Sequence, residues 1–551
     1  MPTIELSSSA HLFFSVLGRA FRMVLVVGGS GWLLLAPPAF LVERLFGGAP
    51  HKDRPALVTL GVALGGYAVF WLFFLNRWLG MGASGLWAVA ALSGSPALFR
   101  ARRVYAPLAL AVGVALLSLG LQNLREPLEG SFTLSFQLPG WALPGDPHLP
   151  DDLAHHLLHG EDPRDAGSTW RSSDRPPLQA GLSLLLRPLG SVLGAERFET
   201  YHLMAVLFQS LWAVAALFFL DAVGVAGPAR RLSFLFCLFS FFFFVNTLFV
   251  WPKFLSASLA LFGVVFLFYR EPTRLNTIVG AAFTTLGALA HGGVLFSLAL
   301  LVPAWIVRVV RAHHRRLVPQ FFGAAFLLYL PWTLYQRFYD PPGNRLLKMH
   351  FAGVEAVDSR TVWQALRNAY ATQTWSQILH TRWANAVSFP FQSEIPRLEF
   401  SFPSLIRGDR VDSFFYFGPM IGILWLGALA IGVQAIHKRS TGVADGIRWL
   451  AFLTLSYFFW TLSIFNANWS SLHQGSYLLP LLATLIFSAA FARTFGRLAT
   501  TLALGHRLLW FLAAVLIWPS LWSPLSLPFV LVALTGAGII SSKIYDPVIS
   551  G

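Results

Sequence analysis

Near-continuous apolar runs of about 17 to 25 residues recur along most of this 551-residue chain. A helix of that length is needed to cross the hydrocarbon core of a bilayer. Only 12% of the residues are charged, which is too few to cover the surface of a soluble protein of this size. The sequence therefore predicts an all-α polytopic membrane protein.

About fourteen of these runs are predicted to span the membrane, and two long loops separate them into three groups. The predicted spans are 23–42, 57–75, 104–121, 198–222, 231–250, 254–270, 276–290, 292–310, 318–336, 413–435, 447–465, 474–492, 507–521 and 524–541. The Gly- and Ala-rich stretch 80–98 is predicted to be re-entrant or interfacial. The chain is thereby divided into N-terminal spans (1–121), a first loop (122–197), a central transmembrane core (198–336), a second loop (337–412) and C-terminal spans (413–551).

Basic residues lie mainly in the short connections between the predicted spans, which accounts for the formal net charge of +15 without a nucleic-acid partner. Such connections usually face the cytoplasm. This rule predicts a multi-pass protein of the inner or plasma membrane, with both termini in the cytoplasm and both long loops outside. The connections used are those at Arg100–Arg103, Arg230–Arg231, Arg270–Arg274, Arg308–Arg316, Lys438–Arg439 and Arg493–Arg497.

The first loop is acidic, with nine Asp or Glu and four Arg between residues 122 and 180. Its segment 145–160 reads GDPHLPDDLAHHLLHG, and a short helix is predicted to begin just before Asp151 and Asp152. Asp146 precedes that helix and is the preferred general base. Asp151 and Asp152 are alternative bases, or they complement the helix dipole without taking part in chemistry.

Three elements of the first loop together suggest a family. They are Asp146; then Leu157, Leu158 and Gly160 at the end of the predicted helix; then Arg175, Pro176, Pro177 and Leu178. This pattern resembles the GT-C superfamily of integral membrane glycosyltransferases, with the closest likeness to bacterial aminoarabinose transferases and protein O-mannosyltransferases. Two extra spans precede the family's usual first one, and the family's Asp-Glu pair is absent. The acidic role therefore stays open between Asp146 and the pair Asp151 and Asp152.

The end of the first loop is expected to pack on the membrane. Asp174 and Arg175 are expected to pair with each other and so to fix the loop. Residues 176–194 are apolar, contain several Gly and Pro, and are predicted to form an amphipathic juxtamembrane helix on the outer membrane surface.

Basic residues at the outer ends of spans and in the second loop are candidates for binding a lipid phosphate. Arg345 and Lys348 are three residues apart and would share one face of a helix. A simpler reading is contact with lipid headgroups, or, for a His beside two Gly, a place in a turn. The candidates are Arg175, Lys253, His291, Arg337, Arg345, Lys348, His350 and His473.

The resemblance implies a glycosyltransferase that takes a sugar from a polyprenyl-phosphate-linked donor on the extracytoplasmic face. Lys and Arg would hold the phosphate, and Asp would accept the proton of an acceptor hydroxyl or amine on a glycan, lipid or protein. No cofactor or metal is predicted, because Asp409 and Asp412 have no His or third acid nearby. A transporter or flippase of a lipid-linked glycan and a non-catalytic cell-envelope subunit are the alternatives. The scarcity of charges within the spans argues against a transporter.

Overall fold

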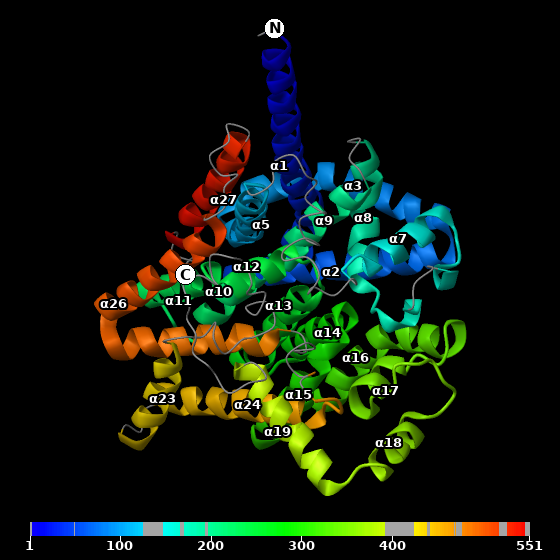
Figure 1. Cartoon of the computed structure of the whole chain (residues 1–551), viewed down its shortest axis with the longest axis vertical. Coiled ribbons are helices and arrows are strands. Elements are labelled where there is room, and N and C mark those ends of the chain that lie inside the picture. Colours follow the sequence, from blue (N-terminus) through cyan, green and yellow to red (C-terminus); the bar gives the residue numbers. More distant parts are fainter. Residues whose placement is uncertain are drawn as a thin grey trace.

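The computed structural model describes residues 3–48, 50–124, 147–165, 170–192, 197–391, 424–437, 441–467, 469, 477–516 and 526–545. These residues form helices and no strand, which confirms the predicted all-α class (Figure 1). The helices are α1 (Thr3–Leu45), α2 (Arg54–Leu75), α3 (Arg77–Arg100), α4 (Arg102–Tyr105), α5 (Ala109–Asn123), α7 (Leu149–His159), α8 (Leu178–Val192), α9 (Arg197–Gln209), α10 (Trp212–Ala222), α11 (Gly227–Leu238), α12 (Phe241–Leu248), α13 (Lys253–Val264), α14 (Arg274–Ala290), α15 (Leu295–Arg311), α16 (Leu317–Leu334), α17 (Arg345–Ala352), α18 (Val362–Ala371), α19 (Trp375–Phe391), α23 (Trp425–His437), α24 (Thr441–Ser463), α26 (Leu478–Leu516) and α27 (Leu527–Tyr545).

Eight helical segments of the described chain are long and apolar enough to cross a membrane, fewer than the fourteen predicted spans. Counting the bent pair α11 and α12, whose axes differ by 58°, as one broken span raises the number to nine. Two predicted spans, 474–492 and 507–521, overlap the two helical parts of α26, which meet at a kink at Gly496, where φ is 77°. The eight segments are His11–Leu45, His51–Leu75, Arg102–Asn123, Arg197–Ala222, Gly292–Arg311, Leu317–Tyr339, Leu478–Leu509 and Leu527–Ile544.

Polar contacts define two ends of the helical bundle. At one end, the Glu43 carboxylate accepts a hydrogen bond from the Tyr105 hydroxyl at 2.6 Å, and Arg270 donates to Asp53 at 2.5 Å. We call this the basic end, because the short connections rich in Arg lie there. At the other end lie α7 and α17, which belong to the two predicted loops, and we call it the loop end.

The first helix begins at the loop end. Arg19 donates to Asn123 at 3.4 Å, and Arg22 lies 3.7 Å from the Glu199 carboxylate. Asn123 ends α5 and Glu199 lies in the first turn of α9, so both residues flank the first loop. The sequence had placed Arg19 and Arg22 on the side away from that loop. The chain therefore enters the bundle from the loop end, with the start of α1 projecting beyond the other helices (Figure 1).

The stretch predicted to be re-entrant is a continuous helix that runs back to the basic end. Asn76 caps α3 by accepting from Trp78 N at 2.8 Å, and Arg77 donates to His159 O of α7 at 3.1 Å. Trp87, in the middle of α3, donates to Leu33 O of α1 at 2.9 Å. Several exposed side chains of α3 are apolar, and they include Trp78, Leu79, Leu86, Val89, Leu92 and Phe99.

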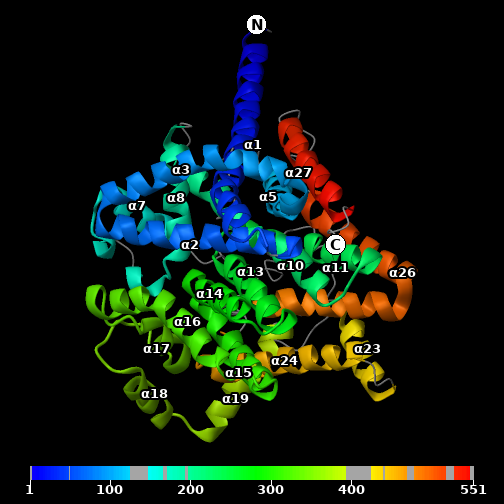
Figure 2. The same cartoon turned by 180° about the vertical axis from the view of Figure 1, so that it is seen from behind.

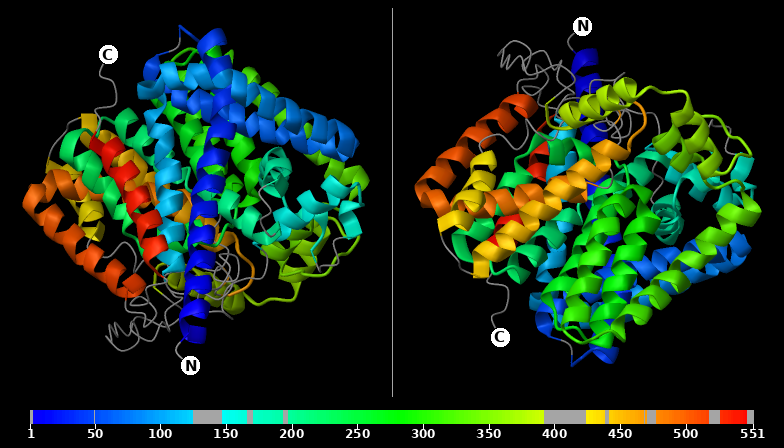
Figure 3. Two further views of the ribbon diagram at one scale, coloured as in Figure 1. Left: turned by 90° about the horizontal axis from the view of Figure 1, so that it is seen from above. Right: turned by 90° about the horizontal axis from the view of Figure 1, so that it is seen from below.

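The last helix ends at the basic end. α27 packs antiparallel to α5, with Ala533 against Gly120 and Ile540 against Gly113 (Figure 3). Small residues in α5 let the two helices approach closely, which is typical of helix packing in membranes. The two described ends of the chain therefore lie at opposite ends of the bundle, whereas the sequence had placed both termini on one side.

The amphipathic pattern of residues 176–194 predicts a helix on the outer membrane surface. Helix α8 is instead buried within the protein. Its residues from Leu178 to Leu186 are all buried. A Cβ atom on Gly181 would come within 2.2 Å of the Gly66 carbonyl oxygen of α2. The apolar face of α8 thus packs against another helix, while Gln179 donates to Val250 O and Arg187 pairs with Asp151. This packing fixes the Arg-Pro-Pro element that precedes α8.

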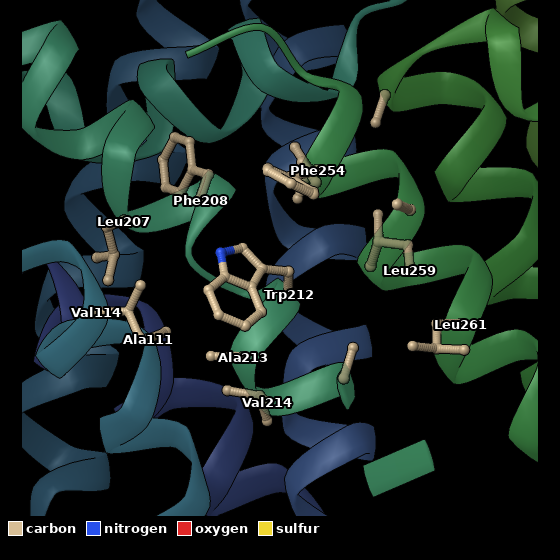
Figure 4. Close-up of a cluster of buried hydrophobic side chains, with 14 of the residues drawn as sticks. Ala111, Val114, Leu207, Phe208, Trp212, Ala213, Val214, Phe254, Leu259 and Leu261 are labelled. Carbon is tan, nitrogen blue, oxygen red and sulfur yellow. The ribbon is translucent and has the colours of Figure 1, made fainter. Parts of the chain in front are cut away.

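Aromatic side chains fill the centre of the bundle. Figure 4 shows Trp212 of α10 surrounded by side chains from α5, α9 and α13. The Trp212 indole donates to the Thr247 hydroxyl at 3.1 Å, and its ring lies 5.1 Å from that of Phe243. The single polar atom of this side chain is therefore satisfied within an apolar core, and the packing holds α12 and α13 beside α10.

Candidate functional site

The predicted short helix of the first loop is confirmed as α7. It has Pro150 in its first turn, and it ends at Gly160, which adopts a left-handed conformation with φ of 74°. Asp151 lies in the first turn, but it caps nothing. Its fully buried carboxylate pairs with Arg187 of α8 at 3.0 Å and with Arg197 of α9 at 2.9 Å.

The two adjacent carboxylates of α7 tie three helices together. Asp152 also pairs with Arg197, at 2.8 Å, and lies 3.3 Å from the His148 ring. Burial raises the pKa of Asp151 to about 6, although the positive charges of Arg187 and Arg197 act in the opposite direction. These contacts assign Asp151 and Asp152 a place in the packing of α7 on α8 and α9.

Asp146 lies outside the described residues, but the residue after it is held in a buried hydrogen-bond network. The Tyr201 hydroxyl donates to Pro147 O at 2.9 Å and accepts from the Gln179 amide at 2.8 Å. The same amide nitrogen donates to Val250 O at 2.9 Å. Val250 precedes Trp251, Pro252 and Lys253, which we call the Trp-Pro-Lys corner. The start of α7, the Arg-Pro-Pro element and this corner therefore meet at one place.

The Trp-Pro-Lys corner buries its lysine. Only 2% of the Lys253 surface is exposed, so this side chain does not extend to the membrane surface. Its Nζ lies 3.7 Å from the Trp251 ring centroid and 5.0 Å from that of Tyr477. The Tyr477 hydroxyl in turn donates to Asn246 at 2.5 Å. The ammonium group is therefore held between two electron-rich aromatic faces at the loop end.

Two further basic side chains lie near Lys253. The Arg175 guanidinium stacks over the Trp170 ring, with 4.4 Å between the guanidinium carbon and the ring centroid. Burial lowers the pKa of His350 to about 4, and the positive charges of Lys253 and Arg175 lower it further. The His350 ring is therefore neutral near pH 7, with Nδ1 2.7 Å from Leu346 O. We call Arg175, Lys253 and His350 the basic cluster.

The other basic candidates of the second loop are bound to protein acceptors. Arg345 donates to Asp174 at 2.8 Å, and it also lies 5.2 Å from the Trp170 ring. Lys348 is fully buried and pairs with Asp358 at 2.5 Å. Both residues belong to α17, as predicted, but they stabilise the loop. Arg337 is exposed, and His473 lies outside the described residues.

The candidate His291 holds a turn next to the corner. Its Nδ1 accepts from Gly293 N at 3.1 Å, which caps the short 3-10 helix Gly292–Val294. Its carbonyl oxygen accepts from the Ser256 hydroxyl at 3.3 Å, one turn along α13 from Lys253. His291 therefore lies in the neighbourhood of the basic cluster and shapes the backbone there.

Asp340 joins the two loops, although the sequence offered no reason to select it. This buried carboxylate accepts from Arg171 at 2.7 Å, from the Ser172 hydroxyl at 2.8 Å and from Ser173 N at 2.9 Å. The only local signal is its position before two prolines. Because its three partners come directly before Asp174 and Arg175, Asp340 fixes the backbone that presents Arg175 to the cluster.

A cavity of about 20 Å³ lies between α7 and the segment that carries Arg175. That volume holds roughly one water molecule. Entry of a larger substrate at this point therefore requires neighbouring side chains, such as the stacked Trp170, to move. The lining residues are Leu149, Asp152, Leu153, Pro163, Trp170, Arg171, Ser172 and Arg175.

Comparison with known proteins gives no relative from which a function could be transferred. No protein-family model, no curated protein and no solved structure matches this chain. The assignment of function therefore depends on the arrangement of the residues alone.

Proposed function

We propose that this protein is an integral membrane glycosyltransferase that uses a polyprenyl-phosphate-linked sugar. The observation that carries the proposal is the basic cluster. Lys253 is buried between Trp251 and Tyr477, and Arg175 lies close enough for both charges to lower the pKa of His350. The positive charges of Lys253 and Arg175 would complement the negative charge of a lipid phosphate.

The cluster would act on the leaving group. Lys253 and Arg175 would contact the phosphate oxygens, and Arg175 offers a planar fork suited to two of them. As the bond between the anomeric carbon and the phosphate oxygen breaks, negative charge grows on the phosphate. Fixed positive charges stabilise that change, which is usually the largest catalytic contribution.

The general base in this proposal is Asp146. Asp151 and Asp152 form ion pairs with Arg187 and Arg197 that pack α7 on α8 and α9, so the proposal gives them a structural role. The acceptor oxygen or nitrogen would attack the anomeric carbon, its proton would pass to Asp146, and the polyprenyl phosphate would leave. The GT-C resemblance implies inversion at that carbon. Pro147, the next residue in the chain, accepts from Tyr201 in the hydrogen-bond network that also includes Gln179 and Val250 O.

The loop end would face away from the cytoplasm. The short connections at the basic end carry the arginines that obey the positive-inside rule, including Arg102, Arg270, Arg308 and Arg493. With α1 entering from the loop end and α27 ending at the basic end, the N-terminus would be extracytoplasmic and the C-terminus cytoplasmic. This proposed orientation differs from the sequence-based prediction of two cytoplasmic termini.

A transfer assay with isolated membranes and radiolabelled polyprenyl-phosphate sugars tests the proposal. Lys253→Met removes the charge and should lower the rate on the order of 10²- to 10³-fold, whereas Lys253→Arg should retain part of it. Lys52→Met, at the exposed basic end, is the matched control and should transfer at the wild-type rate. The proposal is overturned if wild-type membranes transfer no sugar, or if Lys253→Met transfers as well as wild type while folding normally.

A further inference from the structure

The surface formed by α18 and α19 carries a stripe of exposed aromatic side chains. Trp375, Leu379 and Trp383 follow one another at intervals of four residues and therefore lie on one face of α19. Their exposed fractions are 79%, 65% and 68%. Figure 2 shows both helices at the lower edge of the molecule, and α18 packs beside α17 while α19 packs beside α24. Exposed indoles in register need a partner surface.

The position of α19 places this stripe level with the ends of apolar helices. Asn385 donates to Ile464 O at 2.9 Å, just beyond the end of α24. Near that end, Trp460 packs on Phe296, the second residue of α15, at 4.4 Å between ring centroids. Since α15 belongs to a candidate membrane span, the stripe lies at the level at which that span would leave the hydrocarbon core.

The neighbouring surface of α18 is basic. A groove of about 580 Å³ is lined by Ser359, Arg360, Trp363, Gln364, Arg367 and Asn368. Trp363 is 74% exposed, and Arg367 follows it by one turn. Arg360 pairs with Asp358 at 2.6 Å, but residues 359–391 contain three Arg and no Asp or Glu. The surface as a whole therefore attracts anions.

We propose that α18 and α19 bind the membrane surface, with the α19 stripe in the lipid interface and the α18 groove holding the phosphate of an anionic phospholipid headgroup. Trp side chains favour the interface, where the indole is apolar and its N–H can reach water. Arg360 and Arg367 supply the charges that complement a headgroup phosphate. This surface is separate from the basic cluster, and the proposal does not depend on sugar transfer.

Spin labels in nanodiscs test the stripe. Cys237 is the only cysteine, so Leu379→Cys and Thr381→Cys can be labelled individually in a Cys237→Ser background. Residue 381 is two positions along α19 and points to the opposite side. We expect the label at 379 to collide more often with oxygen than with an aqueous nickel complex, and more so than the label at 381. A label at 379 that is fully accessible to nickel, or one immobilised by a second protein copy, overturns the proposal.

Hydrogen exchange of the α18 peptide tests the groove. We expect slower exchange in nanodiscs of phosphatidylglycerol than in nanodiscs of phosphatidylcholine. The double variant Arg360→Gln and Arg367→Gln should lose this difference, and Arg360→Lys with Arg367→Lys should keep most of it. Arg315→Gln with Arg316→Gln removes the same charge from the basic end and should leave α18 unaffected. Equal exchange in the two lipids with the wild-type chain overturns the groove assignment.

Discussion

Arg345 of the second loop donates to Asp174 of the first loop across 2.8 Å, although 171 positions separate them in the sequence. Both side chains are largely buried, with 11% and 2% of their surfaces exposed. Asp174 also accepts from Arg171 N at 3.0 Å. The pair therefore fixes the turn before Arg175, and it links the position of one loop to that of the other.

Breaking this pair at one side should destabilise the protein. Arg345→Gln leaves the Asp174 carboxylate buried without its ion pair, which costs about 3–5 kcal/mol. The thermal unfolding midpoint in detergent should fall clearly. Arg345→Gln combined with Asp174→Asn should cost less than the sum of the single changes, because neither charge is then left alone. Additive losses would show that the two residues act independently.

The close contact between α8 and α2 leads us to expect that a larger residue at Gly181 destabilises the protein. Gly181→Ala should destabilise the fold by about 1–3 kcal/mol, because a Cβ there would meet the backbone of Gly66 at 2.2 Å. Gly85→Ala in α3 is the matched control, since no atom lies within 4 Å of the point that its Cβ would occupy and alanine favours a helix. Unfolding midpoints of the two variants provide the comparison, and equal midpoints would contradict the close packing.

Hydropathy predicted much of this fold because the bilayer requires continuous apolar segments. It did not predict α3 as one continuous helix, because Gly, Ala and Ser between Gly80 and Ser95 lower the hydropathy of this stretch, although Trp78, Leu86 and Leu92 are exposed apolar residues of the helix. Hydropathy also cannot give contacts between distant segments, such as that of Arg22 in α1 with Glu199 in α9.

The sequence identified the basic residues of the candidate site, but it did not show which acidic residues pair with the other basic candidates. Lys253 was identifiable because a charged residue stood at the edge of an apolar run. Sequence alone could not separate it from Lys348, since both are basic residues near the loop end. Asp358, ten residues after Lys348, was a local signal that the latter has an acidic partner. No comparable signal links Asp174 to Arg345, because their contact depends on how two distant loops fold together.

Asp151 and Asp146 should respond differently to loss of charge. Asp151→Asn leaves Arg187 and Arg197 facing a neutral side chain, so it should lower the unfolding midpoint strongly. Asp146→Asn should leave the midpoint near that of wild type and, under the proposed mechanism, reduce sugar transfer on the order of 10²- to 10⁴-fold. Unchanged transfer in folded Asp146→Asn would remove this residue from the mechanism.

Acid should weaken the fold partly through His350. Its pKa is about 4 in the folded protein against 6.5 for an ordinary His, so the unfolded chain binds a proton first as pH falls. Above pH 6.5 His350 is neutral in both states and does not reduce the free energy of unfolding. Between pH 6.5 and about pH 4 its protonation in the unfolded chain lowers that free energy progressively, by on the order of 3 kcal/mol in total. His350→Asn cannot titrate and should lose less stability than wild type across this range. Unfolding midpoints measured between pH 7 and 4 check this, and parallel curves for the two proteins would contradict it.

The bundle predicts that the chain ends lie on opposite sides of the membrane. In a Cys237→Ser background, Ser8→Cys lies at the start of α1 and Ser541→Cys near the end of α27. A membrane-impermeant maleimide added to intact cells should label residue 8 and not residue 541, because α1 enters from the loop end while α27 ends beside Gly113 at the basic end. Permeabilised cells should label both positions, which controls for accessibility. Labelling of both or neither in intact cells would place the termini on one side of the membrane and contradict the prediction.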